Sequence, residues 1–160
     1  MTAKIPYMAL VFVVVSNVSA VEWIEYPVPT LAEAAGAAEV IVIVRVVSGE
    51  SGELATAYVG ECIKGTAVGE TKIMRKYMAP SLAGDPDPEY FIFRNGKEYC
   101  LFCADKGDYY EPYYRWNTLW AVARVENGVI DLSAFADELD DRWVELDDFN
   151  DEVARANGWK

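Results

Sequence analysis

Residues 40–47 constrain the fold more than any other part of this chain, because every one of them except Arg45 is valine or isoleucine. These β-branched residues favour an extended backbone, and successive side chains of a strand point to opposite faces of its sheet. A run that is apolar at consecutive positions therefore indicates a strand that is apolar on both faces. We expect it to be a central strand of a sheet.

Two neighbouring segments extend this sheet. Residues 54–63 follow a turn cluster of serine and glycine at 48–52, and we expect them to pair with residues 40–47 as a hairpin. Residues 71–78 alternate without a clearly apolar face and contain lysines on one side. That pattern is typical of an edge strand, where lysine discourages pairing with another molecule.

Two Asn-Gly pairs predict further hairpins, because both residue types tolerate the positive φ of a tight two-residue turn. The first pair, Asn95-Gly96, lies between the expected strands 90–94 and 97–104. The second pair, Asn127-Gly128, lies between the expected strands 119–125 and 129–132. The middle of the chain is therefore a succession of short strands, which favours a barrel or a sandwich.

Helices are expected at both ends of these strands. Thr30 and Glu33 have the spacing of a capping box and introduce a short alanine-rich helix that ends near residue 38. Near the C-terminus, Leu146, Phe149 and Val153 form a stripe at helical spacing, with acidic residues in the first turn. We expect this segment to cover the sheet.

The first twenty residues have the pattern of an export signal. Lys4 precedes an apolar run over residues 5–15, and small residues then lead to Ala20, after which we expect cleavage. A helix that spans a membrane needs about 20 apolar residues, so this run is too short to be a stable anchor. We therefore predict a signal peptide over 1–20, one domain over 21–160, and a secreted or periplasmic protein. The alternative is an uncleaved segment at a membrane interface.

Charge and composition exclude several classes of function. The net charge of the whole chain is −12, and it becomes −13 when residues 1–20, with one lysine and no acid, are removed. Nucleic acid would be repelled, and a partner steered by charge would be basic. The chain has no histidine, which removes the usual general base and the commonest zinc ligand. We predict no cofactor and no metal, because the acidic clusters lack the order of a calcium-binding loop.

Two stretches resemble a known family. Tyr58 with Glu61-Cys62-Ile63-Lys64-Gly65, and further along Gly96-Lys97-Glu98-Tyr99-Cys100-Leu101-Phe102, are similar to the pattern of netrin-like OB-fold domains, the group that includes tissue inhibitors of metalloproteinases. The likeness spans about residues 38–132. It implies a mainly β fold, namely a five-stranded Greek-key barrel with a short N-terminal helix and a C-terminal helical cover. It also implies an exported protein that binds other proteins.

The inhibitory residues of that family do not carry over to this chain. Those inhibitors chelate the zinc of their target through an N-terminal cysteine, whereas the processed chain would begin Val21-Glu22-Trp23. Most of the family's disulfides are also absent, since the chain has three cysteines. Inhibition by that mechanism is therefore not expected.

The three cysteines allow several interpretations. Cys100 and Cys103 have a C-x-x-C spacing, but their flanks indicate a strand, where residues three apart point to opposite faces. In an exported protein Cys62 could form a structural disulfide with one of them, and we assign Cys100. Alternatively, all three are buried thiols that act as small apolar residues. Redox or metal chemistry is the third interpretation.

An aromatic segment is the candidate binding surface. Tyrosine and tryptophan offer large rigid faces with a polar tip, which suit contact with a peptide or a sugar. The alternative is that these rings close the end of the core. The residues concerned are Tyr109, Tyr110, Tyr113, Tyr114 and Trp116.

The leading hypothesis is an exported, non-catalytic binding protein with a protein partner, and inhibition of a secreted enzyme is its most specific form. One alternative is a glycoside hydrolase that works with two carboxylates, which would have to face each other across a cleft. The other is a structural subunit of an envelope assembly, which would expose a sizeable apolar patch.

The export signal is directly testable. When the full chain is produced in a host with a secretion pathway, we expect the exported protein to begin at Val21, as measured by intact mass. An Ala20→Tyr variant should remain unprocessed, because the position before the cleavage site requires a small side chain. Exported protein that still begins at Met1 or Thr2 would contradict this prediction.

Overall fold

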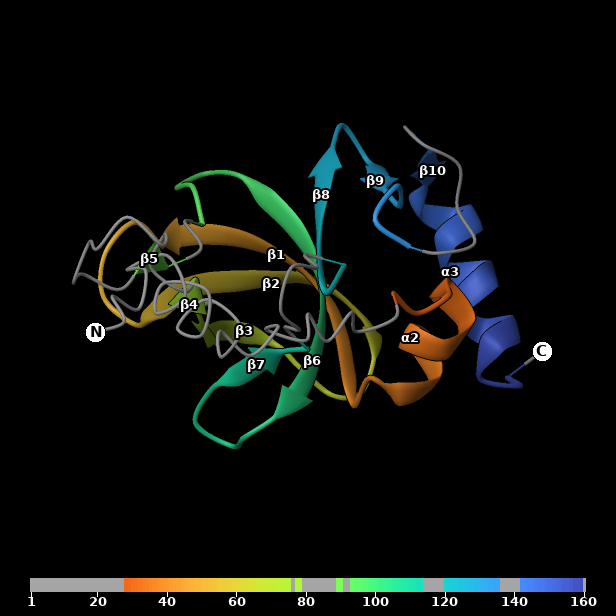
Figure 1. The fold of residues 1–160 in the computed structure, drawn as a ribbon, viewed down its shortest axis with the longest axis horizontal. Helices are drawn as coiled ribbons and strands as arrows, with labels where there is room; N and C mark the ends of the chain where they lie inside the picture. Colours follow the sequence, from red (N-terminus) through yellow and green to blue (C-terminus); the bar gives the residue numbers. More distant parts are fainter. Residues whose placement is uncertain are drawn as a thin grey trace, which may run out of the picture.

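The computed structural model describes residues 28–75, 77–78, 89–90, 93–113, 120–135 and 142–159, so the expected signal peptide lies outside the described residues. Its centre is a closed five-stranded barrel (Figure 1). The barrel strands are β1 (Val40–Ser48), β2 (Leu54–Lys64), β3 (Gly69–Met74), β6 (Glu98–Asp105) and β7 (Tyr110–Pro112).

The barrel has OB-like topology. Around its wall the strands follow the order β1, β2, β3, β7, β6, and β6 pairs again with β1, which closes the ring. Neighbours are antiparallel except β3 and β7, which are parallel. This Greek-key order is that of a five-stranded OB barrel. The expectation of a mainly β, OB-like barrel is therefore confirmed.

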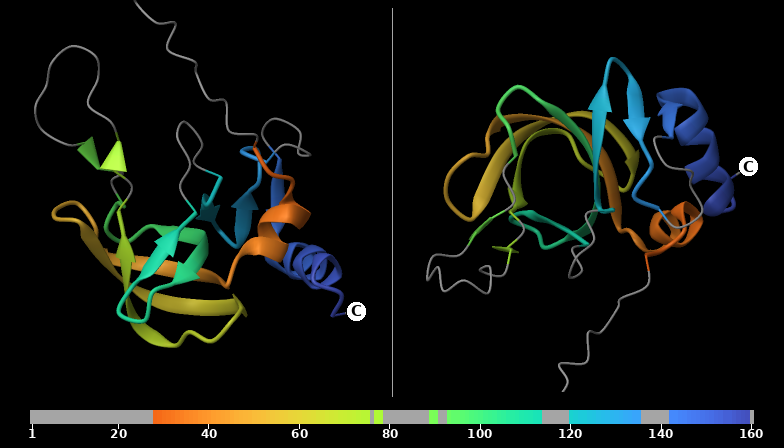
Figure 2. Two further views of the ribbon diagram at one scale, coloured as in Figure 1. Left: turned by 60° about the horizontal axis from the view of Figure 1, so that its bottom comes forward. Right: turned by 45° about the horizontal axis from the view of Figure 1, so that its top comes forward.

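Strand β6 belongs to two arrangements. One of its edges pairs with β1, while its other edge pairs with β8 (Val122–Glu126) over residues 98–101 and with β7 over residues 103–105. From β8 the sheet continues through β9 (Val129–Asp131) to β10 (Trp143–Glu145). Figure 2 shows these strands leaving the barrel wall towards the helices. Two short strands, β4 (Tyr77–Met78) and β5 (Glu89–Tyr90), pair separately.

Both expected helices are present. In α2 (Leu31–Ala37) the Thr30 hydroxyl accepts the Glu33 amide at 3.2 Å, and the Glu33 carboxylate accepts the Thr30 amide at 2.9 Å. The C-terminal helix α3 (Leu146–Ala156) buries Phe149 and Val153. The two helices lie against one side of the barrel, which confirms the helical cover (Figure 2).

The apolar run at residues 40–46 is divided between two cores, whereas Val47 is 49% exposed. Val40, Val42, Val44 and Val46 of β1 point into the barrel, where small residues of β2 such as Ala57 leave room for them. Ile41 and Ile43 point the other way, into a second core between the barrel wall, β8 to β10 and the helices. The expectation of a central strand with two apolar faces is confirmed.

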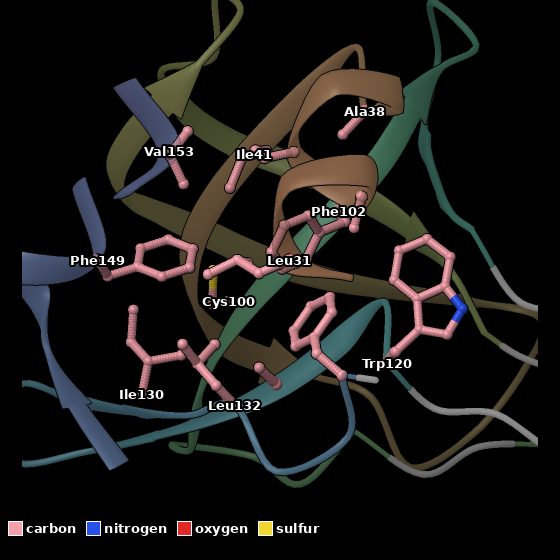
Figure 3. Packing of buried hydrophobic residues seen from close by; sticks show 14 of the residues in the cluster. Leu31, Ala38, Ile41, Cys100, Phe102, Trp120, Ile130, Leu132, Phe149 and Val153 are labelled. Carbon is pink, nitrogen blue, oxygen red and sulfur yellow. The ribbon is translucent and has the colours of Figure 1, made fainter. Parts of the chain in front are cut away.

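The second core is organised around Phe102 of β6, which is fully buried (Figure 3). Its ring makes edge contacts with Trp120, Phe135 and Phe149, whose centroids lie 5.3–6.2 Å away. Phe149 brings α3 into this cluster, and Leu31 brings α2. Aromatic contacts of this kind add to the stabilisation from apolar burial. The helices therefore pack on side chains of β6 as well as on those of β1.

The hairpin predicted around Asn95-Gly96 is wrong. In the described residues β6 pairs with β1, β7 and β8, and not with residues 90, 93 and 94. The turn itself forms, with a φ of 76° at Gly96, and the Gly96 amide donates to Val46 O at 2.8 Å. The turn therefore leads into β6, which pairs with β1 and contributes buried apolar side chains to both cores. The hairpin at Asn127-Gly128 is confirmed.

The edge strand predicted at residues 71–78 is also wrong. Strand β3 ends at Met74 and is paired on both sides, with β2 and with β7. At its end the amide of the buried Arg75 donates to Glu53 O, and Arg75 Nη1 donates to Gly52 O. The strand is interior because its single fully buried side chain, Ile73, faces the barrel core.

Glycine 49 provides a stability test. A Cβ atom there would lie 2.4 Å from Phe93 O, so we expect Gly49→Ala to lower the free energy of unfolding by about 2 kcal/mol. The control is Gly36→Ala in α2, where nothing lies within 4 Å of the added carbon. It should raise stability by up to about 1 kcal/mol. Urea unfolding measures both, and equal stability of the Gly49→Ala variant and the parent would contradict the close contact.

Candidate functional site

The candidate site lies where the barrel wall opens. Strands β3 and β7 meet at one residue pair, Ile73 with Tyr110. Before that pair, β3 diverges from the loop that joins β6 to β7, and a hollow of about 230 Å³ lies between them. Its lining residues are Val68, Glu70, Thr71, Lys72, Gly107, Asp108, Tyr109 and Tyr110.

The loop on one side of the hollow is held by local hydrogen bonds. The Lys106 amide donates to Tyr109 O at 3.1 Å, and the Gly107 amide donates to the Asp105 carboxylate at 2.8 Å. Gly107 has a φ of 84°, which favours glycine at this turn. The Asp105 amide in turn donates to the Glu39 carboxylate. The loop therefore presents Asp108 and Tyr109 from a defined turn.

Charges of both signs line the hollow. Lys72 Nζ donates to the Thr56 hydroxyl at 2.6 Å and lies 3.6 Å from Glu70 Oε1. Thr56 belongs to β2, on the side of β3 opposite the loop. The Lys72 ammonium is therefore drawn towards β2. Glu70 on β3 and Asp108 on the loop contribute one carboxylate from each wall.

The structure divides the predicted aromatic site. Tyr109 and Tyr110 line the hollow, while Tyr114 and Trp116 lie outside the described residues. Tyr113 stacks on Trp120 with ring centroids 6.3 Å apart and donates to Ala37 O at 3.3 Å. Tyr113 thus connects α2 to the second core, which contains Trp120.

Tyr110 is anchored at the base of the hollow. Its hydroxyl donates to Thr66 O at 3.4 Å, and its ring packs against the barrel core. Burial, and then the negative charge of Asp105, raise the pKa of the Tyr110 hydroxyl. The phenol therefore remains a neutral donor at physiological pH. Of the three predicted aromatic residues that the structure describes, Tyr109 is the one placed for contact with a ligand.

A surface that the sequence analysis missed adjoins the hollow. We call the outward side chains of β2 and β3 the β2–β3 face. Tyr58 and Leu54 on this face are 53% and 41% exposed. The alternation of β2 could have revealed this face in the sequence. Ala55 and Ala57 point inward, so the side chains at positions 54, 56 and 58 point outward. The face comprises Leu54, Thr56, Tyr58, Glu70, Lys72 and Met74.

The cysteines are free thiols, and their placement does not favour the predicted Cys62–Cys100 disulfide. Cys100 lies in the second core, outside the barrel, whereas Cys62 packs against the barrel interior together with Cys103. The sheet therefore separates Cys62 from Cys100. Burial raises the pKa of the Cys100 thiol and that of the Cys103 thiol, so both are poor nucleophiles. The C-x-x-C spacing places its two thiols on opposite faces, as expected for a strand.

In the described ranges, no three or more histidine, cysteine or carboxylate side chains lie together so that they could hold a metal ion. Among the same residues, no helix is long and apolar enough to cross a membrane.

The thiols provide a test of this arrangement. Because Cys62 is half-buried and the other two are fully buried, we expect Ellman's reagent at pH 8 to modify one thiol of the folded protein rapidly. A Cys62→Ala variant should lose this fast phase, and three thiols should react in denaturant. A protein with one thiol in denaturant and a mass lower by about 2 Da, from the two hydrogens lost, would instead show a disulfide.

Comparisons of this chain with family models, with curated proteins and with solved structures found no match.

Proposed function

We propose that this chain is an exported, non-catalytic binding protein, and that it contacts a protein partner through the β2–β3 face and the adjoining hollow. The observation that carries the proposal is the exposure of Tyr58 and Leu54 on a barrel strand, next to a hollow that Tyr109 lines. Barrels of this topology bind oligonucleotides and oligosaccharides on the face of their second and third strands and with the adjoining loops, so this is the surface that the fold leaves open to a partner. Exposed tyrosine is enriched where proteins bind one another.

Charge supports a protein partner over nucleic acid. The chain carries a net charge of −12, which repels a phosphate backbone. A basic protein would instead be attracted, and complementary charge accelerates its association. The resemblance to netrin-like domains points in the same direction, because those domains bind proteins. Inhibition of a secreted enzyme is the most specific form of this proposal, by a mechanism that does not use an N-terminal cysteine.

The hydrolase alternative has one observation in its favour, since Glu70 and Asp108 line the same hollow. A glycosidase needs a carboxylic acid kept protonated near neutral pH, usually by burial. The Glu70 side chain is 53% exposed and lies beside the Lys72 ammonium. Such exposure supports the binding role over the catalytic one.

Affinity capture tests the proposal. Protein purified from an exporting host would serve as bait for the extracellular or envelope fraction of its own organism. We expect a partner whose capture falls about tenfold or more with Tyr58→Ala, since aromatic residues at the centre of an interface carry much of the binding energy. The matched control is Trp159→Ala, which removes an equally exposed ring, 53%, outside this face. This control should capture the partner normally.

Three outcomes would contradict the proposal, either in its interface or in its binding role. One is capture that is equal for the parent and the Tyr58→Ala variant, which would place any interface elsewhere. Another is release of reducing sugars from a polysaccharide that Glu70→Gln and Asp108→Asn each abolish, because that result would establish the hydrolase. Assembly of the purified chain with itself, lost in the Tyr58→Ala variant, would support the envelope subunit instead.

A further inference from the structure

The two walls of the hollow present carboxylates that differ in their pairing. Glu70 lies 3.6 Å from the Lys72 ammonium, so part of its charge is balanced within the chain. Asp108, on the opposite wall, has no ion pair with a described residue. The neighbouring loop lysine, Lys106, is engaged by Glu111 at 3.3 Å. The local charges therefore leave the hollow negative.

The cation that lines the hollow is held at its far side. Lys72 Nζ donates to the Thr56 hydroxyl on β2, so its ammonium is drawn away from the loop that carries Asp108. The space between the two walls is thus left to a positive group from outside. A net charge of −12 on the whole chain attracts such a group from a distance.

The remaining lining residues discriminate between cations. Tyr109 is partly exposed on one wall, and an aromatic face attracts a guanidinium both as a cation and as a flat surface. Arginine offers a planar fork of donors for two carboxylates and is less strongly hydrated than lysine. At the rim, Val68 is 88% exposed, which supplies an apolar contact for an aliphatic side-chain stem.

We infer that the hollow receives an arginine side chain of the protein partner, with the guanidinium between the carboxylates of Glu70 and Asp108 and against Tyr109. This inference rests on the proposed function and specifies its partner as a segment that exposes arginine. The β2–β3 face, on which Tyr58 lies opposite Glu70, contacts the surface around that arginine. Hydrogen bonds at Lys106 and Gly107 hold the loop in its turn before the ligand arrives, which lowers the entropic cost of binding.

Short peptides test the inference without knowledge of the partner. The probe is the blocked pentapeptide Gly-Val-Arg-Val-Gly, and its comparison peptide carries citrulline, which has nearly the same shape without the charge. In amide NMR spectra of the exported protein, the arginine peptide should shift the resonances of Glu70, Lys72 and Asp108. We expect citrulline to weaken binding about tenfold, and added sodium chloride to weaken binding of the arginine peptide.

Matched variants separate a specific site from general attraction. Glu70→Gln combined with Asp108→Asn should weaken the arginine peptide about tenfold. The control combines Glu126→Gln with Asp147→Asn, two exposed carboxylates on β8 and α3, and changes the net charge equally. It should bind the peptide almost as well as the parent does. Equal weakening by the two double variants would overturn the inference, because it would reduce the effect to net charge.

Three further results would overturn the inference, and the last of them leaves the proposed function standing. Equal binding of the arginine and citrulline peptides would exclude a guanidinium site. Chitotriose or maltotriose that shifts the same resonances, with no shift from the arginine peptide, would assign the hollow to a saccharide. A partner whose capture depends on Tyr58 but not on Glu70 and Asp108 would support the proposed function while the arginine site fails.

Discussion

The structure depends on strand β1, because both of its faces carry apolar side chains that must be buried. Val40, Val42, Val44 and Val46 of β1 are covered by a wall that curves back over them, and Ile41 and Ile43 are covered by a second layer outside that wall. A flat sheet would leave one set in water, at a cost that grows with the apolar area exposed. The barrel therefore buries one face of β1, and the helical cover helps to bury the other. The rest of the chain supplies the barrel wall and the outer layer.

Strand β6 connects the barrel to the outer layer, and its pairing also produces the candidate site. It gives one edge to β1, and it shares its other edge between β8, which leads to the outer layer, and β7, which closes the barrel. Because only the end of that edge remains for β7, β7 is three residues long and meets β3 at one pair. The wall opens beside this short contact, and the hollow lies there. The site is thus a geometric consequence of how the core is closed.

Local signals in the sequence predicted local structure well. The capping box at Thr30, the turn at Asn127-Gly128 and the stripe of the last helix each depend on residues within a few positions, and all are confirmed. The errors concern pairing between distant segments. The Asn95-Gly96 turn forms, but β6 pairs with β1, some fifty positions earlier along the chain. Alternation alone could not show that Ile73 makes β3 an interior strand, because the partner β7 is defined only by the closed barrel.

The candidate site could be predicted from the sequence only in part, for a related reason. Tyr109, Tyr110 and Tyr113 look alike in sequence, yet strand alternation and the end of β7 place them differently. Tyr109 lies on a wall of the hollow that a ligand can reach, and Tyr110 lines the hollow with its hydroxyl bonded to Thr66 O. Tyr113 stacks on Trp120 in the second core. The carboxylates across the hollow come from segments 38 positions apart, Glu70 and Asp108, and no spacing rule joins them. Tyr58, Glu70 and Asp108 belong to neither core. The residues of the proposed interface can therefore vary without loss of the fold, whereas Phe102 and the buried valines of β1 cannot.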